Sequence, residues 1–222
     1  MAGCTIPTES QMQAVRRAAA ASEPRTHALI ALAANLGLRA GCLSQLRWGD
    51  VMYGTVVKPL IRVPRAIQKG GRGAYKRAVR TLELPINDEA KRALERFAAA
   101  RLANGPVHNR APLFPSRKGG AITRWQVNHL VQGVFARAGL CGMGAWGVHS
   151  LRKLFARRLL AVSPVSNMQI PQAALGHSRL AITEIYIAVD MDDVAAAVQA
   201  IGKGDPSTCM VPGAAFRSAV AE

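Results

Sequence analysis

The sequence predicts an α+β fold that is mainly helical, with a small three-stranded antiparallel sheet. Aromatic residues make up only 5% of the chain and alanine-rich stretches are frequent, which favours closely packed helices over a β-sandwich. Two β-like runs, 55–69 and 77–85, are separated by the glycine-rich turn GGRGAY. Half of the 222 residues are hydrophobic, so the chain can bury one sizeable core. We expect one domain over residues 1–203 and a flexible tail over 204–222.

Three helices are expected before the sheet, at 8–21, 25–38 and 39–48. Thr8, Ser10 and Gln11 are residues typical of a helix start. Glu23 and Pro24 are expected to end the first helix, and Gly37 to close the second.

Six helices are expected after the sheet, at 87–104, 123–140, 149–162, 168–175, 178–188 and 191–201. Asn87 or Asp88 would cap the first of these, because acidic residues crowd its first turn and Arg101 lies in its last. Thr123 would cap the second.

The chain is strongly basic, with a net charge of +16 and a pI of about 11. Between Asp50 and Glu83, and again between Glu95 and Glu184, all charged side chains are basic. Such long basic stretches would repel one another without a polyanionic partner, so we expect nucleic-acid binding.

Cysteine usage and hydropathy indicate a soluble intracellular protein. The four cysteines form no C-x-x-C pair and have no histidine at metal-ligand spacing, so we expect free thiols and neither a metal nor a cofactor. No signal peptide is visible. The longest apolar stretch, ALIALAANLGL, is much shorter than the ~20 residues that cross a bilayer.

Three polar motifs suggest chemistry at a phosphodiester. Arg39 follows a helix end, the sequence VHSLRKLF places His149 and Arg152 on one helix face, and LGHSRLAITEIY contains His177 and Tyr186. Arginines hold phosphate oxygens, and a tyrosine can act as a covalent nucleophile if nearby groups help to remove its proton. A lysine on the hairpin could protonate the leaving oxygen.

In this order and at this spacing, the motifs resemble the catalytic domain of the tyrosine recombinases, also called phage integrases. The resemblance spans about residues 8 to 201. It implies that Arg39 and Arg152 clamp the phosphate, that His149 assists proton transfer, and that His177 hydrogen-bonds the phosphate. Tyr186 would form a 3′-phosphotyrosine intermediate without metal or ATP.

The resemblance also implies partners and a location. The partners are double-stranded DNA with inverted-repeat sites and further copies of the chain, in a tetramer on DNA with no membrane role. The protein would be cytoplasmic, in the bacterial nucleoid. The family's N-terminal helical domain is not found in the sequence, so we expect a catalytic domain alone, as in the fimbrial phase-switch invertases.

The sequence departs from the family pattern in places. Cys42 stands where many members have an acid, and Lys153 where many have a second histidine. The hairpin lysine is either Lys69 or Lys76, and Lys69 is preferred because it comes directly before Gly70-Gly71. The alternative function is a DNA-binding relative that no longer cuts. The three tryptophans are expected to pack in the core or between helices, and the remaining histidines to be structural or surface residues: Trp48, Trp125, Trp146, His27, His108 and His129.

Overall fold

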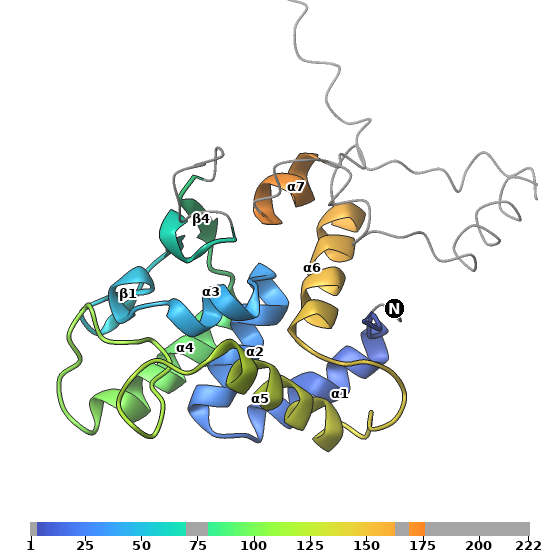
Figure 1. Cartoon of the computed structure of the whole chain (residues 1–222), viewed down its shortest axis with the longest axis horizontal. Helices are drawn as coiled ribbons and strands as arrows, with labels where there is room; N and C mark the ends of the chain where they lie inside the picture. Colours follow the sequence, from blue (N-terminus) through green and yellow to red (C-terminus); the bar gives the residue numbers. More distant parts are fainter. Residues whose placement is uncertain (1–3, 70–79, 163–168, 176–222) are drawn as a thin grey trace, which may run out of the picture.

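The computed structural model describes residues 4–69, 80–162 and 169–175. These residues form a helical body with two short antiparallel strand pairs at one side (Figure 1). The expected mainly helical α+β fold class is confirmed. The α-helices are α1 Glu9–Ala20, α2 Pro24–Leu36, α3 Ala40–Gln45, α4 Asp88–Leu102, α5 Arg124–Arg137, α6 Val148–Val162 and α7 Gln169–Leu175. The remaining elements are β1 Met52–Tyr53, β2 Val56–Val57, β3 Leu60–Val63, β4 Leu82–Pro85 and the 3₁₀ turns η1 Trp48–Asp50 and η2 Arg65–Ile67.

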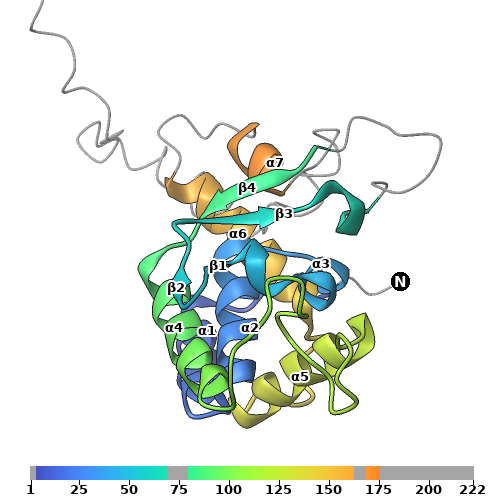
Figure 2. The same cartoon turned by 90° about the vertical axis from the view of Figure 1, so that its left-hand side faces the viewer.

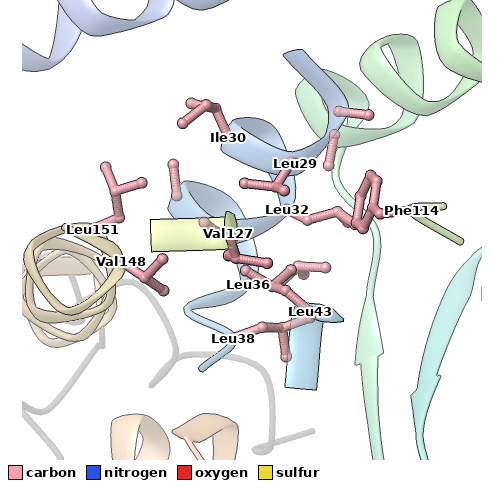
Figure 3. Packing of buried hydrophobic residues seen from close by; sticks show 14 of the residues in the cluster. Leu29, Ile30, Leu32, Leu36, Leu38, Leu43, Phe114, Val127, Val148 and Leu151 are labelled. Atoms are coloured by element: carbon pink, nitrogen blue, oxygen red, sulfur yellow. The ribbon is translucent and has the colours of Figure 1, made fainter. Parts of the chain in front are cut away.

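Helix α2 is the centre of the core. Nearly every residue from Ala28 to Leu36 is buried, so this helix is apolar all round, as expected of a helix enclosed by others. Helices α1, α4, α5 and α6 all contact it. Its alanines let these neighbours approach closely, while its larger side chains fill the gaps. Figure 3 shows the resulting cluster, which includes Leu29, Ile30, Leu32 and Leu36 together with Phe114, Val127, Val148 and Leu151.

The helix starts follow local capping chemistry. Thr8 and Thr123 cap α1 and α5, each in a reciprocal capping box with a glutamine three residues on. Asn87 caps α4 by accepting a hydrogen bond from the Ala90 N–H. Pro24 does not belong to the end of α1. It is the first residue of α2, where its missing N–H costs nothing.

The strands form two two-stranded pairs among the described residues, where one three-stranded sheet was expected. The run 55–69 is not continuous because Pro59 and Pro64 cannot donate to a ladder. These prolines divide it into β2, β3 and η2. Strand β3 pairs with β4 in a register that places Ile61 opposite Leu84 on the buried face.

The β3–β4 pair lies across one end of the helical body, at the same end as α7 (Figure 2). Helix α6 runs from the core toward this end, and it contacts both α2 and α7. The helices expected at 178–188 and 191–201 lie outside the described residues. In the part of the chain that is described, no helix is long and apolar enough to cross a membrane.

Candidate active site

Arg152 joins three segments of the chain that the sequence motifs singled out. It lies on α6 and is 2% exposed. Its Nη1 donates a hydrogen bond to the carbonyl oxygen of Gly37, at the end of α2, and its Nη2 donates one to the carbonyl oxygen of Leu175, at 2.8 Å. Gly37 comes two residues before Arg39, and Leu175 is the first residue of the L-G-H motif. One guanidinium therefore brings the first arginine, the H-x-x-R motif and the start of L-G-H together.

A glycine at the end of α2 allows α6 to pack closely against it. Gly37 has the left-handed φ of 58° that ends a helix, as the sequence predicted. A β-carbon on Gly37 would come within 2.3 Å of the Phe155 ring, which lies one helical turn after Arg152. The absence of a side chain therefore lets α6 lie directly against the end of α2.

Arg39 begins α3 as its N-terminal cap residue, and its carbonyl oxygen accepts hydrogen bonds from the Cys42 and Leu43 N–H groups. Its side chain is half-buried. Among the described residues, no group accepts a hydrogen bond from its guanidinium. The two predicted arginines thus differ: Arg152 is anchored inside the protein, and Arg39 has a guanidinium that can bind an external anion.

His149 lies in the first turn of α6, and the start of that helix is fixed by α5. The Asn128 side-chain oxygen accepts a hydrogen bond from the Val148 N–H at 3.0 Å, so it caps α6 from another element. A β-carbon on Gly147 would lie 2.8 Å from the same oxygen. Asn128 is a residue that sequence reasoning missed, because nothing local indicates a cap supplied from a neighbouring helix.

The surroundings of His149 keep its imidazole neutral. Although His149 is exposed overall, partial burial of its ring is the largest cause of a lowered pKa. The positive charges of Arg152 and Arg39, and then of Lys153 and Lys69, lower that pKa further. Four positive charges therefore act on one histidine. A neutral ring at physiological pH can accept a proton.

Lys69 is exposed and follows η2, at the last described residue before the gap at 70–79. Its charge lowers the pKa of His149, as the charges of the two arginines do. Lys76, His177 and Tyr186 lie outside the described residues. Of the residues predicted for the site, the structure describes Arg39, Lys69, His149 and Arg152.

Cys42 and Lys153, the two departures from the family pattern, both have partners. The buried Cys42 thiol donates to the carbonyl oxygen of Ile67 at 3.5 Å. Lys153 donates to the carbonyl oxygen of Cys4 at 3.2 Å, which ties the N-terminal segment to α6. Within the described ranges, no three His, Cys, Asp or Glu side chains gather closely enough to hold a metal ion.

The prediction that all three tryptophans pack in the core or between helices is wrong for Trp125. Trp48 and Trp146 are buried, and Trp146 stacks on Phe135. Trp125 is 70% exposed and stacks on His129 at a ring distance of 5.2 Å. It is the second residue of α5.

A match to a protein-family model shows which family the chain belongs to. The model of the phage integrase family matches residues 8–193, most of the chain and all of the motif positions. The chain belongs to the phage integrase family.

Curated relatives within the phage integrase family are tyrosine recombinases. Tyrosine recombinase XerC of Actinobacillus pleuropneumoniae is 30% identical over 175 residues, which are 78% of this chain and 50% of that protein. XerC of Xanthomonas campestris is 29% identical over 77% of this chain and 46% of its own length. XerD of Caulobacter vibrioides is 28% identical over 89% of this chain and 63% of its own length. The chain spans about half the length of the XerC proteins that it matches.

Solved structures share this phage integrase fold. XerA recombinase superposes with a TM-score of 0.69 at 21% identity, covering 89% of this chain and 65% of that one. XerH bound to its difH substrate, in a pre-cleavage complex, gives a TM-score of 0.62 at 23% identity, with 87% and 53% covered. At these identities the likeness establishes the fold.

Proposed function

We propose that this chain is the catalytic part of a site-specific recombinase that cleaves and rejoins DNA through a 3′-phosphotyrosine intermediate. The reaction would serve the integration, excision or inversion of a mobile element. The observation that carries the proposal is the Arg152 side chain, which gathers three motif segments at one buried guanidinium.

The two arginines have complementary parts in the proposal. The Arg39 guanidinium would bind non-bridging oxygens of the scissile phosphate and stabilise the charge that develops on them. Arg152 would add its charge from the protein side and hold the end of α2 and the end of α7 in place around the phosphate. His177 follows Leu175 by two residues and would hydrogen-bond the same phosphate.

The proposed reaction step is a transesterification at phosphorus. The Tyr186 oxygen attacks phosphorus, and its proton passes to the neutral His149. A bond forms between phosphorus and the tyrosine oxygen, and the bond to the 5′-oxygen breaks. Lys69 gives that oxygen a proton. Rejoining reverses the step with the 5′-hydroxyl of another strand, so the phosphotyrosine conserves the bond and no ATP is consumed.

The proposed partner is double-stranded DNA with inverted-repeat sites, on which the chain assembles as a tetramer in the bacterial nucleoid. The net charge of +16 supports a polyanionic partner. Two structural neighbours were solved with such partners, XerH bound to its difH substrate and lambda integrase bound to a COC′ core site.

A nicked suicide substrate tests the proposal. The duplex would be selected from a random-sequence pool by binding, and its scissile phosphate mapped with the wild-type chain. A nick close to the scissile phosphate releases a short fragment and traps the covalent product on a denaturing gel. We expect the wild-type chain to form the adduct, and Tyr186→Phe to bind the same DNA without forming it. Binding without any adduct in the wild type would instead indicate a DNA-binding relative that does not cut.

A further inference from the structure

The segment that carries Lys69 is held by a buried side-chain amide. Gln68 lies directly before Lys69 and is buried. Its Nε2 donates hydrogen bonds to the carbonyl oxygens of Val63, at 3.0 Å, and Arg80, at 2.8 Å. Val63 is the last residue of β3, and Arg80 lies just before β4. One amide nitrogen therefore joins the two arms of the β3–β4 hairpin where they leave the sheet.

Glutamine is suited to this place. The amide nitrogen has two N–H groups and uses both, one for each carbonyl. Glutamate would present only acceptors at neutral pH and would repel the same oxygens. Asparagine has the same donors on a stem one carbon shorter.

A second contact ties the same segment to the helix that begins at Arg39. The Cys42 thiol, on α3, reaches the carbonyl oxygen of Ile67, the residue before Gln68. Burial is the main cause of a raised pKa for Cys42, and the charges of Arg39 and Arg152 oppose it only in part. The thiol therefore keeps its proton and acts as the donor.

We propose that Gln68 is a positioning residue for the Lys69 general acid, with Cys42 as the link that sets the lysine segment against Arg39. The backbone is pinned at Ile67 and Gln68, on two successive residues before the lysine. A lysine side chain is long and flexible, so its reach is decided by where its backbone is held. Displacement of a catalytic group by about 1 Å can cost ~10²-fold in rate. The inference rests on the proposed role of Lys69.

The test compares two leaving groups at one scissile phosphate. One duplex has the ordinary 5′-oxygen, and the other has a 5′-bridging sulfur, which leaves as a thiolate without needing a proton. Single-turnover cleavage is measured with wild type, Lys69→Ala, Gln68→Ala and Gln68→Met. Methionine keeps the length and the burial of the stem and removes both donors. Asn104→Ala is the matched control, because Asn104 is an exposed amide just after α4 that donates to the Ala100 carbonyl oxygen of that helix.

We expect both Gln68 variants to cleave the oxygen substrate ~10²-fold more slowly than wild type. On the sulfur substrate they should return to within a few-fold of wild type, as Lys69→Ala should. Asn104→Ala should match wild type on both. The ratio of the two rates is taken within each variant, so a loss of folded protein cancels.

The possible failures are distinguishable. If sulfur does not rescue Lys69→Ala, the proposed role of Lys69 is wrong. If it rescues Lys69→Ala, but the Gln68 variants either cleave normally or are slowed equally on both substrates, the positioning role of Gln68 is overturned.

Discussion

At the residue scale, Arg152 has a structural role that its position in the H-x-x-R motif does not indicate. A planar guanidinium with several donors can serve two carbonyl oxygens on different helices at once, and here those oxygens belong to Gly37 and Leu175. Lysine carries the same charge on one nitrogen and lacks this planar geometry. The residue is thus both a structural link and a positive charge beside the proposed phosphate.

Replacing Arg152 should therefore reduce stability as well as cleavage. Arg152→Ala leaves two carbonyl oxygens without their donor, so we expect the free energy of unfolding to fall by about 2–5 kcal/mol. Arg152→Lys should lie between Ala and wild type. Denaturant melts measure the change, and Arg92→Ala, at an exposed position of α4, is the control. An Arg152→Ala melt equal to that of the control would show that the two hydrogen bonds contribute nothing.

His149 should make stability depend on pH. Its pKa in the folded chain is below the ordinary 6.5, so the unfolded chain binds this proton more readily. The folded state therefore loses stability relative to the unfolded state as pH falls below 6.5, until the folded pKa is reached. Glutamine at position 149 does not titrate. We therefore expect the melting temperature of His149→Gln to fall less than that of wild type between pH 7.5 and pH 5.5. A larger loss in the variant would mean that the pKa of His149 is raised instead.

At the scale of elements, the joint between α2 and α6 depends on a glycine in a left-handed conformation. Gly37 combines a φ of 58° with a ring in contact, whereas Gly54 has a φ of 57° in open space. Gly41 lies in α3 with neither constraint. A comparison of the three glycines therefore separates the stability cost of backbone strain from the stability cost of close packing.

Alanine substitutions at these three glycines should differ in their effect on the free energy of unfolding. Gly41→Ala should be neutral or slightly stabilising, and Gly54→Ala should cost about 1 kcal/mol of strain. Gly37→Ala should cost about 3 kcal/mol, because strain and overpacking against Phe155 add. Thermal melts give the order. Equal losses for Gly37→Ala and Gly54→Ala would mean that the Phe155 ring moves aside without cost.

The elements also show what could be predicted from the sequence. Helix caps such as Thr8, Thr123 and Gly37 follow from local chemistry, and the structure bears them out. The capping of α6 by Asn128 and the bracing of the hairpin by Gln68 join residues from separate segments, so no local pattern indicates them. The β-like run 55–69 is divided in the structure because Pro59 and Pro64 cannot donate to a strand ladder, although β-branched residues lie around them.

At the scale of the whole molecule, charge is divided unevenly along the chain. The basic body precedes a C-terminal segment that holds Glu184, Asp190, Asp192 and Asp193. In the same segment Ala195, Val198 and Ile201 fall at helical spacing as an apolar stripe. This segment lies outside the described residues, and its proposed role in a tetramer rests on the sequence.

Deleting residues 190–222 should separate DNA binding from assembly. Single-site binding should persist, because the basic body remains, while cooperative binding and strand exchange should be lost. A gel-shift titration on a two-site DNA, with wild type beside the truncated chain, measures the cooperativity. Equal cooperativity in the two proteins would rule out a role for the segment in assembly.

The central claim is covalent chemistry at Tyr186, and mapping the adduct tests it most directly. The trapped complex is digested with nuclease and trypsin, and the peptide that retains a nucleotide is identified by mass spectrometry. The chain has three tyrosines, Tyr53, Tyr75 and Tyr186, in different tryptic peptides. We predict the nucleotide on Tyr186, in the peptide LAITEIYIAVDMDDVAAAVQAIGK. A nucleotide on Tyr53, on Tyr75 or on any other residue would contradict the account.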